Sequence, residues 1–143
     1  MKSNNLYFLA IVLPEDLQSE IVSIEKHISD QYKTYKSLKI VPHITLKAPF
    51  TIASEMHHAV LDWFSQLSIS TSPFPVELKN FGSIANSSHP VIYINPLPSA
   101  SLNRLQSEIL VQFGSSFPEV KIMAHELSFK PHVTVAYRDL TPE

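Results

Sequence analysis

The order of hydrophobic and polar residues divides the chain into alternating extended and helical segments. Strands are predicted where apolar residues form short runs or alternate with polar ones. These segments cover residues 6–13, 39–50, 74–81 and 91–94, with further strands around residues 121–126 and 128–138. Residues 82–90 are predicted to form a turn, because glycine, asparagine, serine and proline are concentrated there.

Helices are predicted where apolar residues recur every three or four positions. The first covers residues 14–32, opening with a proline and two acidic residues, which favour a helix start. A second is predicted from about residue 54 to 67. The third covers residues 100–113, with Ser99 as its cap and Gly114 just past its end. The pattern therefore predicts a mixed chain of strands and helices.

The two halves of the sequence repeat one another. Residues 17–21, Leu-Gln-Ser-Glu-Ile, recur letter for letter at residues 105–109. His43 lies 26 positions after Leu17, and His132 lies 27 positions after Leu105. Each half reads as strand, helix and strand, which predicts a duplicated unit around a pseudo-two-fold axis. An accidental match of common residues is the alternative, although the preserved spacing argues against it.

A second repeat carries the candidate chemistry. Residues 42–46 read Pro-His-Ile-Thr-Leu, and residues 131–135 read Pro-His-Val-Thr-Val. In a strand, residues two positions apart lie on the same face. Each copy therefore places one imidazole and one hydroxyl on one face and two apolar side chains on the other.

Two such strands facing each other would gather His43, Thr45, His132 and Thr134 around one pocket. Histidine takes up and releases protons near neutral pH, so one imidazole can act as base while the other acts as acid. Threonine hydroxyls can donate to the oxygens of a phosphate as charge develops on them. The pattern favours metal-free acid–base chemistry on a phosphodiester. The alternative is two ordinary strands, each with a half-buried histidine.

Strand parity adds two cations to the candidate site. Lys47 shares a face with the first histidine, and Arg138 shares one with the second if that strand stays straight. Either could bind phosphate, or a carboxylate of a structural neighbour. Aromatic residues on the strands could stack on a base or serve as core residues: Tyr7, Phe50, Tyr93 and Tyr137.

Composition narrows the class of protein. A chain of 143 residues with 44% hydrophobic residues suits one globular domain over residues 1–143. No apolar run is long enough for a membrane span, and the absence of cysteine fits a reducing, cytoplasmic setting. The net charge is −2 and no basic stripe occurs. This disfavours an extended duplex as partner and favours a small nucleotide or an RNA terminus.

Neither a metal nor a cofactor is expected. The adjacent histidines His57 and His58 diverge on a helix, and His125 lacks the second histidine of a zinc-binding helix. The chain has only two glycines, so a glycine-rich loop for nucleotide phosphates is disfavoured.

The paired His-x-Thr motifs, their separation and the strand–helix–strand halves resemble the 2H phosphoesterases across the whole chain. That family includes bacterial RNA 2′,3′-cyclic phosphodiesterases, also called 2′-5′ RNA ligases, and residues 42–50 resemble its smaller bacterial members. The resemblance implies a two-lobed, pseudo-symmetric α+β fold. In such a fold, antiparallel sheets meet at a central cleft, with helices packed outside.

The resemblance also implies an activity: metal-free cleavage of 2′,3′-cyclic phosphate or 2′-5′ linkages. His43 and His132 would form the acid–base pair, and Thr45 and Thr134 would bind the phosphate. By analogy His43 protonates the leaving 3′-oxygen, His132 activates water, and the product keeps a 2′-phosphate. Two alternatives stay open: a non-catalytic nucleotide-binding or regulatory module, and a literal 2′-5′ RNA ligase. The base preference, pathway and oligomeric state are open as well.

Overall fold

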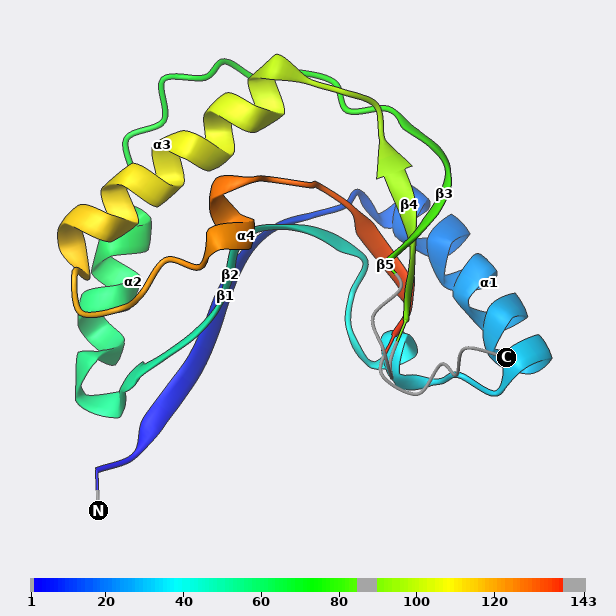
Figure 1. The fold of residues 1–143 in the computed structure, drawn as a ribbon, viewed down its shortest axis with the longest axis horizontal. Helices are drawn as coiled ribbons and strands as arrows, with labels where there is room; N and C mark the ends of the chain where they lie inside the picture. The colour runs from blue at the N-terminus through cyan, green and yellow to red at the C-terminus, as the bar shows by residue number, and fades with distance from the viewer. Residues whose placement is uncertain (1, 85–89, 138–143) are drawn as a thin grey trace. The chain divides into compact units, whose positions relative to one another are not determined.

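The structure is a computed structural model that describes residues 2–84 and 90–137. Helices and strands alternate along the chain (Figure 1). Their order is β1 (Asn4–Val12), α1 (Glu15–Tyr32), the 3₁₀ helix η1 (Lys36–Lys39), β2 (His43–Ala53), the 3₁₀ helix η2 (Ser54–Met56), α2 (His57–Ser65), β3 (Leu78–Ile84), β4 (Val91–Pro96), α3 (Ala100–Ser116), α4 (Ala124–Leu127) and β5 (Val133–Ala136).

The strands form two antiparallel sheets, which confirms the predicted α+β class. One sheet contains β1 and β2, with backbone hydrogen bonds from Leu13 to Pro42 near one end and from Ser54 to Ser3 near the other. The second sheet has the order β3-β4-β5, and both neighbouring pairs are antiparallel. The two His-x-Thr strands, β2 and β5, therefore belong to different sheets.

The chain forms two compact units, and each contains segments from both halves of the sequence. Unit 1 comprises Met1–Leu9, Leu46–Val76 and Pro98–Lys130. Unit 2 comprises Ala10–Thr45, Glu77–Leu97 and Pro131–Glu143. The compact units therefore differ from the two repeats of the sequence.

The core of unit 1 joins β2 to the helices α2 and α3. Phe50 and Ile52 on β2 pack with Val60 of α2, Phe113 of α3 and Phe117 just beyond α3. The rings of Phe50 and Phe113 lie edge to face, with centroids 4.7 Å apart. A helix of the second repeat thus packs on the motif strand of the first.

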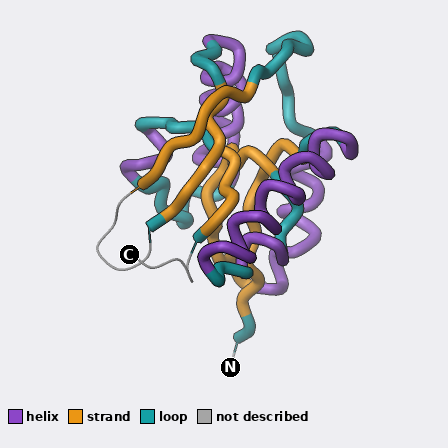
Figure 2. The backbone as a smooth tube through the Cα atoms, turned by 90° about the vertical axis from the view of Figure 1, so that its right-hand side faces the viewer, coloured by secondary structure: helices purple, strands orange, loops and turns teal. Residues whose placement is uncertain are grey.

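Unit 2 shows the converse packing, in which a helix of the first repeat covers a strand of the second. Helix α1 of the first repeat packs against β5, the motif strand of the second repeat (Figures 1 and 2). Ile21 on α1 and both Val133 and Val135 on β5 are buried. Each motif strand is therefore covered by the helix of the other repeat.

The matching pentapeptides play matching roles in α1 and α3. Ile21 is 1% exposed, and its counterpart Ile109 is 3% exposed. Gln18 donates through Nε2 to the carbonyl of Leu13 at 2.5 Å, and Gln106 donates to that of Glu126 at 2.9 Å. The same letters thus bury the same face of the helix and make the same type of bond in both repeats.

Several predicted boundaries are wrong at the ends of elements. The motif strand predicted from residue 39 begins only at His43, because η1 and Pro42 precede it. The strand predicted over residues 74–81 covers Leu78–Ile84 instead. Helix α3 continues through Gly114 to Ser116, so this glycine lies inside the helix and is not its cap.

The strand predicted around residues 121–126 is wrong, and the one predicted over residues 128–138 is found only in part. Residues 124–127 form the short helix α4. Its first turn is stabilised because the carboxylate of Glu126 accepts a hydrogen bond from the backbone N–H of Met123 at 2.7 Å. The last strand is limited to Val133–Ala136, since the chain before it runs through Pro131 without ladder pairing.

Candidate functional site

The first His-x-Thr motif shows the predicted alternation at the start of β2. Ile44 and Leu46 are buried, whereas His43 and Thr45 are half-buried. The apolar side chains therefore hold the strand in the core, and the imidazole and hydroxyl occupy the other face.

The second motif repeats this arrangement at β5. Val133 and Val135 are completely buried, while His132, just before the strand, and Thr134 within it are half-buried. Helix α1 packs against β5, so the face carrying the histidine and threonine lies opposite the buried valines. All four predicted residues, from both motifs, belong to unit 2.

Tyr93 joins this face from the neighbouring strand. It lies directly opposite Thr134 in the β4–β5 ladder, and directly paired residues point to the same side of a sheet. The rings of Tyr93 and His132 lie with centroids 5.4 Å apart and planes tilted by 57°. Among the aromatic candidates, Tyr93 thus contacts a motif histidine.

The ring orientation of His43 determines which nitrogen can exchange a proton. Its Nδ1 lies 2.7 Å from the carbonyl oxygen of Val41. A carbonyl can only accept a hydrogen bond, so Nδ1 carries the hydrogen. The other nitrogen, Nε2, is then the atom that gains or loses a proton when the ring changes charge.

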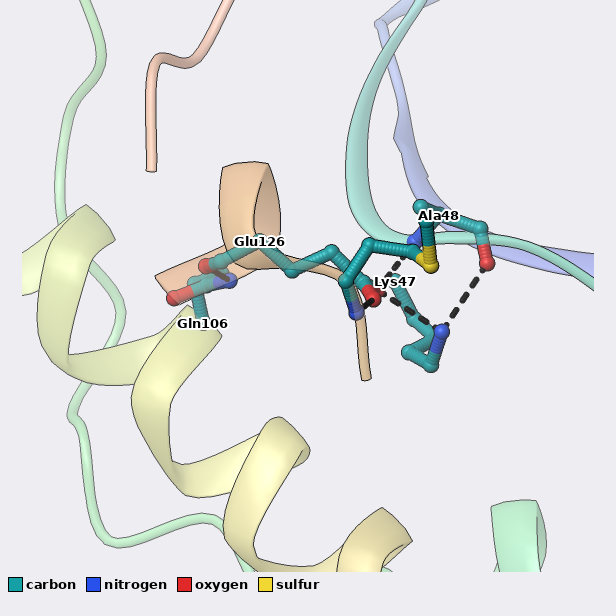
Figure 3. A network of polar contacts seen from close by, with 5 residues as sticks. Lys47, Ala48, Gln106 and Glu126 are labelled. Atoms are coloured by element: carbon teal, nitrogen blue, oxygen red, sulfur yellow. Dashed lines mark hydrogen bonds and ion pairs between the residues drawn. The ribbon is translucent and has the colours of Figure 1, made fainter. Parts of the chain in front are cut away.

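Lys47 is buried in an ion pair and does not lie open on the face of the first histidine. Its side chain is 1% exposed, and its Nζ lies 2.7 Å from Oε1 of Glu126 (Figure 3). Lys47 keeps the face that strand parity predicts, but both Leu46 and Lys47 are buried, so neither face of β2 is open at this point. The neighbouring carboxylate, rather than a phosphate, is the partner of this cation.

Glu126 gathers three donors around one carboxylate. Oε1 accepts from Lys47 and from the backbone N–H of Ala48 at 3.1 Å, while Oε2 accepts from that of Met123 (Figure 3). Burial alone raises the pKa of this carboxyl, but the hydrogen bonds from Lys47 and Met123 and the lysine charge lower it below its usual value overall. The network ties β2 to α4.

The remaining residues predicted for the site are Arg138 and three aromatic residues. Arg138 lies outside the described residues. Tyr7 bonds through its hydroxyl to Nδ1 of His57 at 2.7 Å, and Phe50 is a core residue of unit 1. For these two aromatic residues the core alternative is therefore correct. Tyr137 is half-buried at the end of the described chain.

Residues 2–84 and 90–137 contain no candidate metal centre. In those ranges no group of at least three His, Cys, Asp or Glu side chains could hold an ion. Over the same ranges, every helix is too short or too polar to cross a membrane.

The fold matches that of a solved bacterial protein. A crystal structure from Thermus thermophilus superposes with a TM-score of 0.61, at 19% identity, over 96% of this chain and 75% of that one. At this identity the match demonstrates a shared fold.

The sequence also matches curated bacterial relatives. A protein of Geobacillus kaustophilus named "Putative phosphoesterase" is 28% identical over 134 residues, which cover 94% of this chain and 69% of that protein. A protein of the same name from Bacillus licheniformis is 29% identical over 99 residues, or 69% of this chain and 54% of its own length. This chain thus spans about half the length of the Bacillus relative.

A model of a whole protein family aligns with the chain from residue 13 to its end. The model describes the 2′-5′ RNA ligase superfamily, which corresponds to the 2H phosphoesterases, and it matches residues 13–143. The match includes both His-x-Thr motifs and the helices of both repeats. The chain therefore belongs to the 2′-5′ RNA ligase superfamily.

Proposed function

We propose that this protein is a metal-independent phosphodiesterase acting on 2′,3′-cyclic phosphates or 2′-5′ linkages of nucleotides and RNA ends. His43 and His132 act as the acid–base pair, and Thr45 and Thr134 bind the phosphate. Membership of the superfamily and the names of the relatives support phosphoesterase chemistry.

One observation carries the proposal: the same alternation appears in both motifs, and the two histidines and two threonines belong to one compact unit. In each motif the apolar residues are buried and the histidine and threonine are half-buried. Buried apolar residues make each strand rigid, while half-burial leaves the polar groups within reach of a ligand. We propose that the four polar side chains face one phosphate-sized pocket in unit 2.

The reaction needs a base on one side of the phosphorus and an acid on the other. His132, when neutral, takes a proton from water as the water oxygen forms a bond to phosphorus. His43, as imidazolium, gives its Nε2 proton to the 3′-oxygen as the bond from phosphorus to that oxygen breaks. The product carries a 2′-phosphate and a 3′-hydroxyl, and the two protonation states are restored through solvent.

The threonines supply donors for the charge that develops during attack. Their hydroxyls point from the same strand face as the histidines and can donate to the non-bridging oxygens. Loss of one hydroxyl donor of this kind lowers kcat by about 10²–10³-fold. Because a base and an acid are both present, the proposed steps require no metal to activate water.

The test is a panel of substrates assayed in EDTA with products resolved as 2′- or 3′-phosphates. The panel comprises 2′,3′-cyclic mononucleotides, 2′-5′ oligoadenylates and RNAs ending in a cyclic phosphate. We expect turnover that survives EDTA and a bell-shaped pH profile. His43→Ala and His132→Ala should each lower kcat by about 10²–10⁴ while the circular dichroism spectrum is unchanged.

His125→Ala is the matched control. His125 is exposed on α4 in unit 1, so its loss should leave kcat unchanged. Full activity in either motif variant, or a loss in the control as large as theirs, contradicts the proposal. Tight nucleotide binding without any product favours a regulatory module instead, and joined RNA ends favour a literal ligase.

A further inference from the structure

We propose that Tyr93 is a positioning residue for His132, and that Gly82 is the site in β3 that accommodates its ring. The inference rests on the proposed role of His132. It assigns no contact with substrate to Tyr93. Instead, the tyrosine ring sets the orientation of the imidazole, and the glycine sets the orientation of the ring.

The three-stranded sheet places these residues in one row. Tyr93 on β4 pairs with Gly82 on β3 and with Thr134 on β5. Residues paired directly across a ladder point to the same side, so Gly82, Tyr93 and Thr134 share the face that carries His132. The row therefore joins β3 to the candidate site.

The ring of Tyr93 occupies the space that a side chain at position 82 would need. A Cβ built on Gly82 would lie 2.6 Å from both Cζ and Oη of Tyr93, far inside van der Waals contact. The φ of Gly82 is not positive, so the backbone conformation does not require glycine. Close approach of the aromatic ring is the reason for glycine at this position.

The same ring reaches His132 on its other side. The two centroids are 5.4 Å apart and the planes are tilted by 57°, within the range of a favourable aromatic contact. Tyr93 thus lies between the bare backbone of β3 and the imidazole. A ring confined on one side by β3 restricts the rotation of the imidazole on the other.

A bulge in β3 creates this arrangement. Leu78 pairs with Pro96, but Phe81 pairs with Ile94, so one extra residue of β3 is inserted between them. Without the insertion, the register would place Phe81 opposite Tyr93. Asn80 lies within the bulge at φ 66°, a left-handed conformation that asparagine tolerates better than most residues. The bulge therefore brings glycine, rather than phenylalanine, opposite the tyrosine.

Orientation matters because a proton is transferred over a short distance. An imidazole on a half-exposed strand end can rotate about two side-chain bonds, and a misplacement of about 1 Å can cost about 10²-fold in rate. A fixed ring beside it removes part of that freedom before substrate arrives. We therefore expect Tyr93 to affect kcat rather than KM.

The experiment compares Tyr93→Phe, Tyr93→Ala, Gly82→Ala and the double variant Gly82→Ala/Tyr93→Ala. Tyr93→Phe should keep kcat within about threefold, because the ring is retained. Tyr93→Ala and Gly82→Ala should each lower kcat by about 10- to 100-fold with little change in KM. The double variant should be no worse than Tyr93→Ala, because Gly82 acts only through the ring.

Gly114→Ala in α3 is the matched control. A Cβ there meets Ile122 at 3.4 Å, an ordinary contact, and Gly114 belongs to unit 1. It should leave kcat unchanged. Wild-type kcat in Tyr93→Ala, a further loss in the double variant, or an increase in KM without a fall in kcat would each overturn the positioning role.

A second readout is independent of turnover. The ring current of Tyr93 should shift the Cε1–H resonance of His132, so that resonance should move in Tyr93→Ala and in Gly82→Ala but only slightly in Tyr93→Phe. If no substrate of the panel is cleaved, the proposed function fails, yet this spectrum still tests the contact. A His132 resonance that is unchanged by Gly82→Ala and Tyr93→Ala overturns the inference on its own.

Discussion

Removing one partner of the Lys47–Glu126 ion pair is expected to destabilise the protein strongly. Both side chains are almost completely buried, and Nζ and Oε1 are 2.7 Å apart. Lys47→Met leaves a buried carboxylate with two backbone donors, those of Ala48 and Met123. Glu126→Gln leaves a buried ammonium in contact with the carbonyl of Ala48 and two aromatic rings.

The magnitudes follow from the cost of an uncompensated buried charge. Breaking a buried pair from one side costs about 3–5 kcal/mol. We expect about 3 kcal/mol for Lys47→Met, because Glu126 keeps two donors, and about 4 kcal/mol for Glu126→Gln. The double variant should cost no more than about 3 kcal/mol, the smaller of the two single costs, since no charge is left behind. The coupling is then at least about 4 kcal/mol.

The assay is urea unfolding of the four proteins of this double-mutant cycle. The single tryptophan, Trp63, lies in unit 1 with its ring 5.5 Å from that of Phe113, the same ring that the ammonium of Lys47 faces at 4.7 Å. Its fluorescence therefore reports on the unit that contains the ion pair. Circular dichroism at 222 nm serves as the second probe of the same transition.

A surface pair in the same chain is the control. Lys2 and Glu55 lie 3.7 Å apart, with side chains 83% and 67% exposed. Lys2→Met with Glu55→Gln should show a coupling below about 1 kcal/mol. A coupling at Lys47–Glu126 as small as the surface value would refute the reasoning that burial makes this pair sensitive to the loss of one partner.

Two further predictions concern α1 and α3. Burial raises the pKa of Glu25 to about 7, from 4.5 for an unburied glutamate, so the folded state binds this proton more tightly than the unfolded state. Stability should therefore fall by about 1–3 kcal/mol as pH rises from 4.5 to 7, and Glu25→Gln should remove that fall in urea titrations at several pH values. In α3, the hydroxyl of Ser99 accepts from the backbone N–H of Leu102 at 3.1 Å. Ser99→Ala should cost about 1 kcal/mol of unfolding free energy, whereas an unchanged midpoint would exclude a capping role.

Periodicity was sufficient to predict the motif strands, because packing imposes it directly. The buried positions Ile44 and Val133 and their half-buried neighbours follow the two-residue period of a strand. The helix α1 was equally predictable from its apolar stripe and acidic first turn. In these segments local pattern and tertiary packing agree.

The setting of Lys47 could not be predicted from the same rule. Strand parity names the face of a residue, but it does not indicate which segment covers that face. The covering residue, Glu126, lies 79 positions away in a stretch that was predicted to be a strand. Its four-residue helix is too short to show helical periodicity, so neither the helix nor the ion pair is visible locally.

The sequence indicates the bulge in β3 only weakly. Asn80 and Gly82 are both residue types that strands disfavour, and such residues often mark a bulge or a close backbone approach. The pattern instead places Asn80 in a strand over residues 74–81 and Gly82 at the start of a turn over residues 82–90. The distinction needs the ladder itself, because only the pairing partner, Tyr93, shows why glycine is required.

Because the packing of the repeats is crossed, each motif strand depends on a helix from the other half of the chain. The buried face of β5 is covered by α1, which comes from the first half of the chain, and β2 packs on α3, which comes from the second. Each motif strand thus packs on a helix from the other half, and β2 packs in addition on α2 of its own half. A change that loosens the α1 face, such as ionisation of Glu25, therefore acts on the strand that carries His132, while a change in α3 acts on the strand that carries His43.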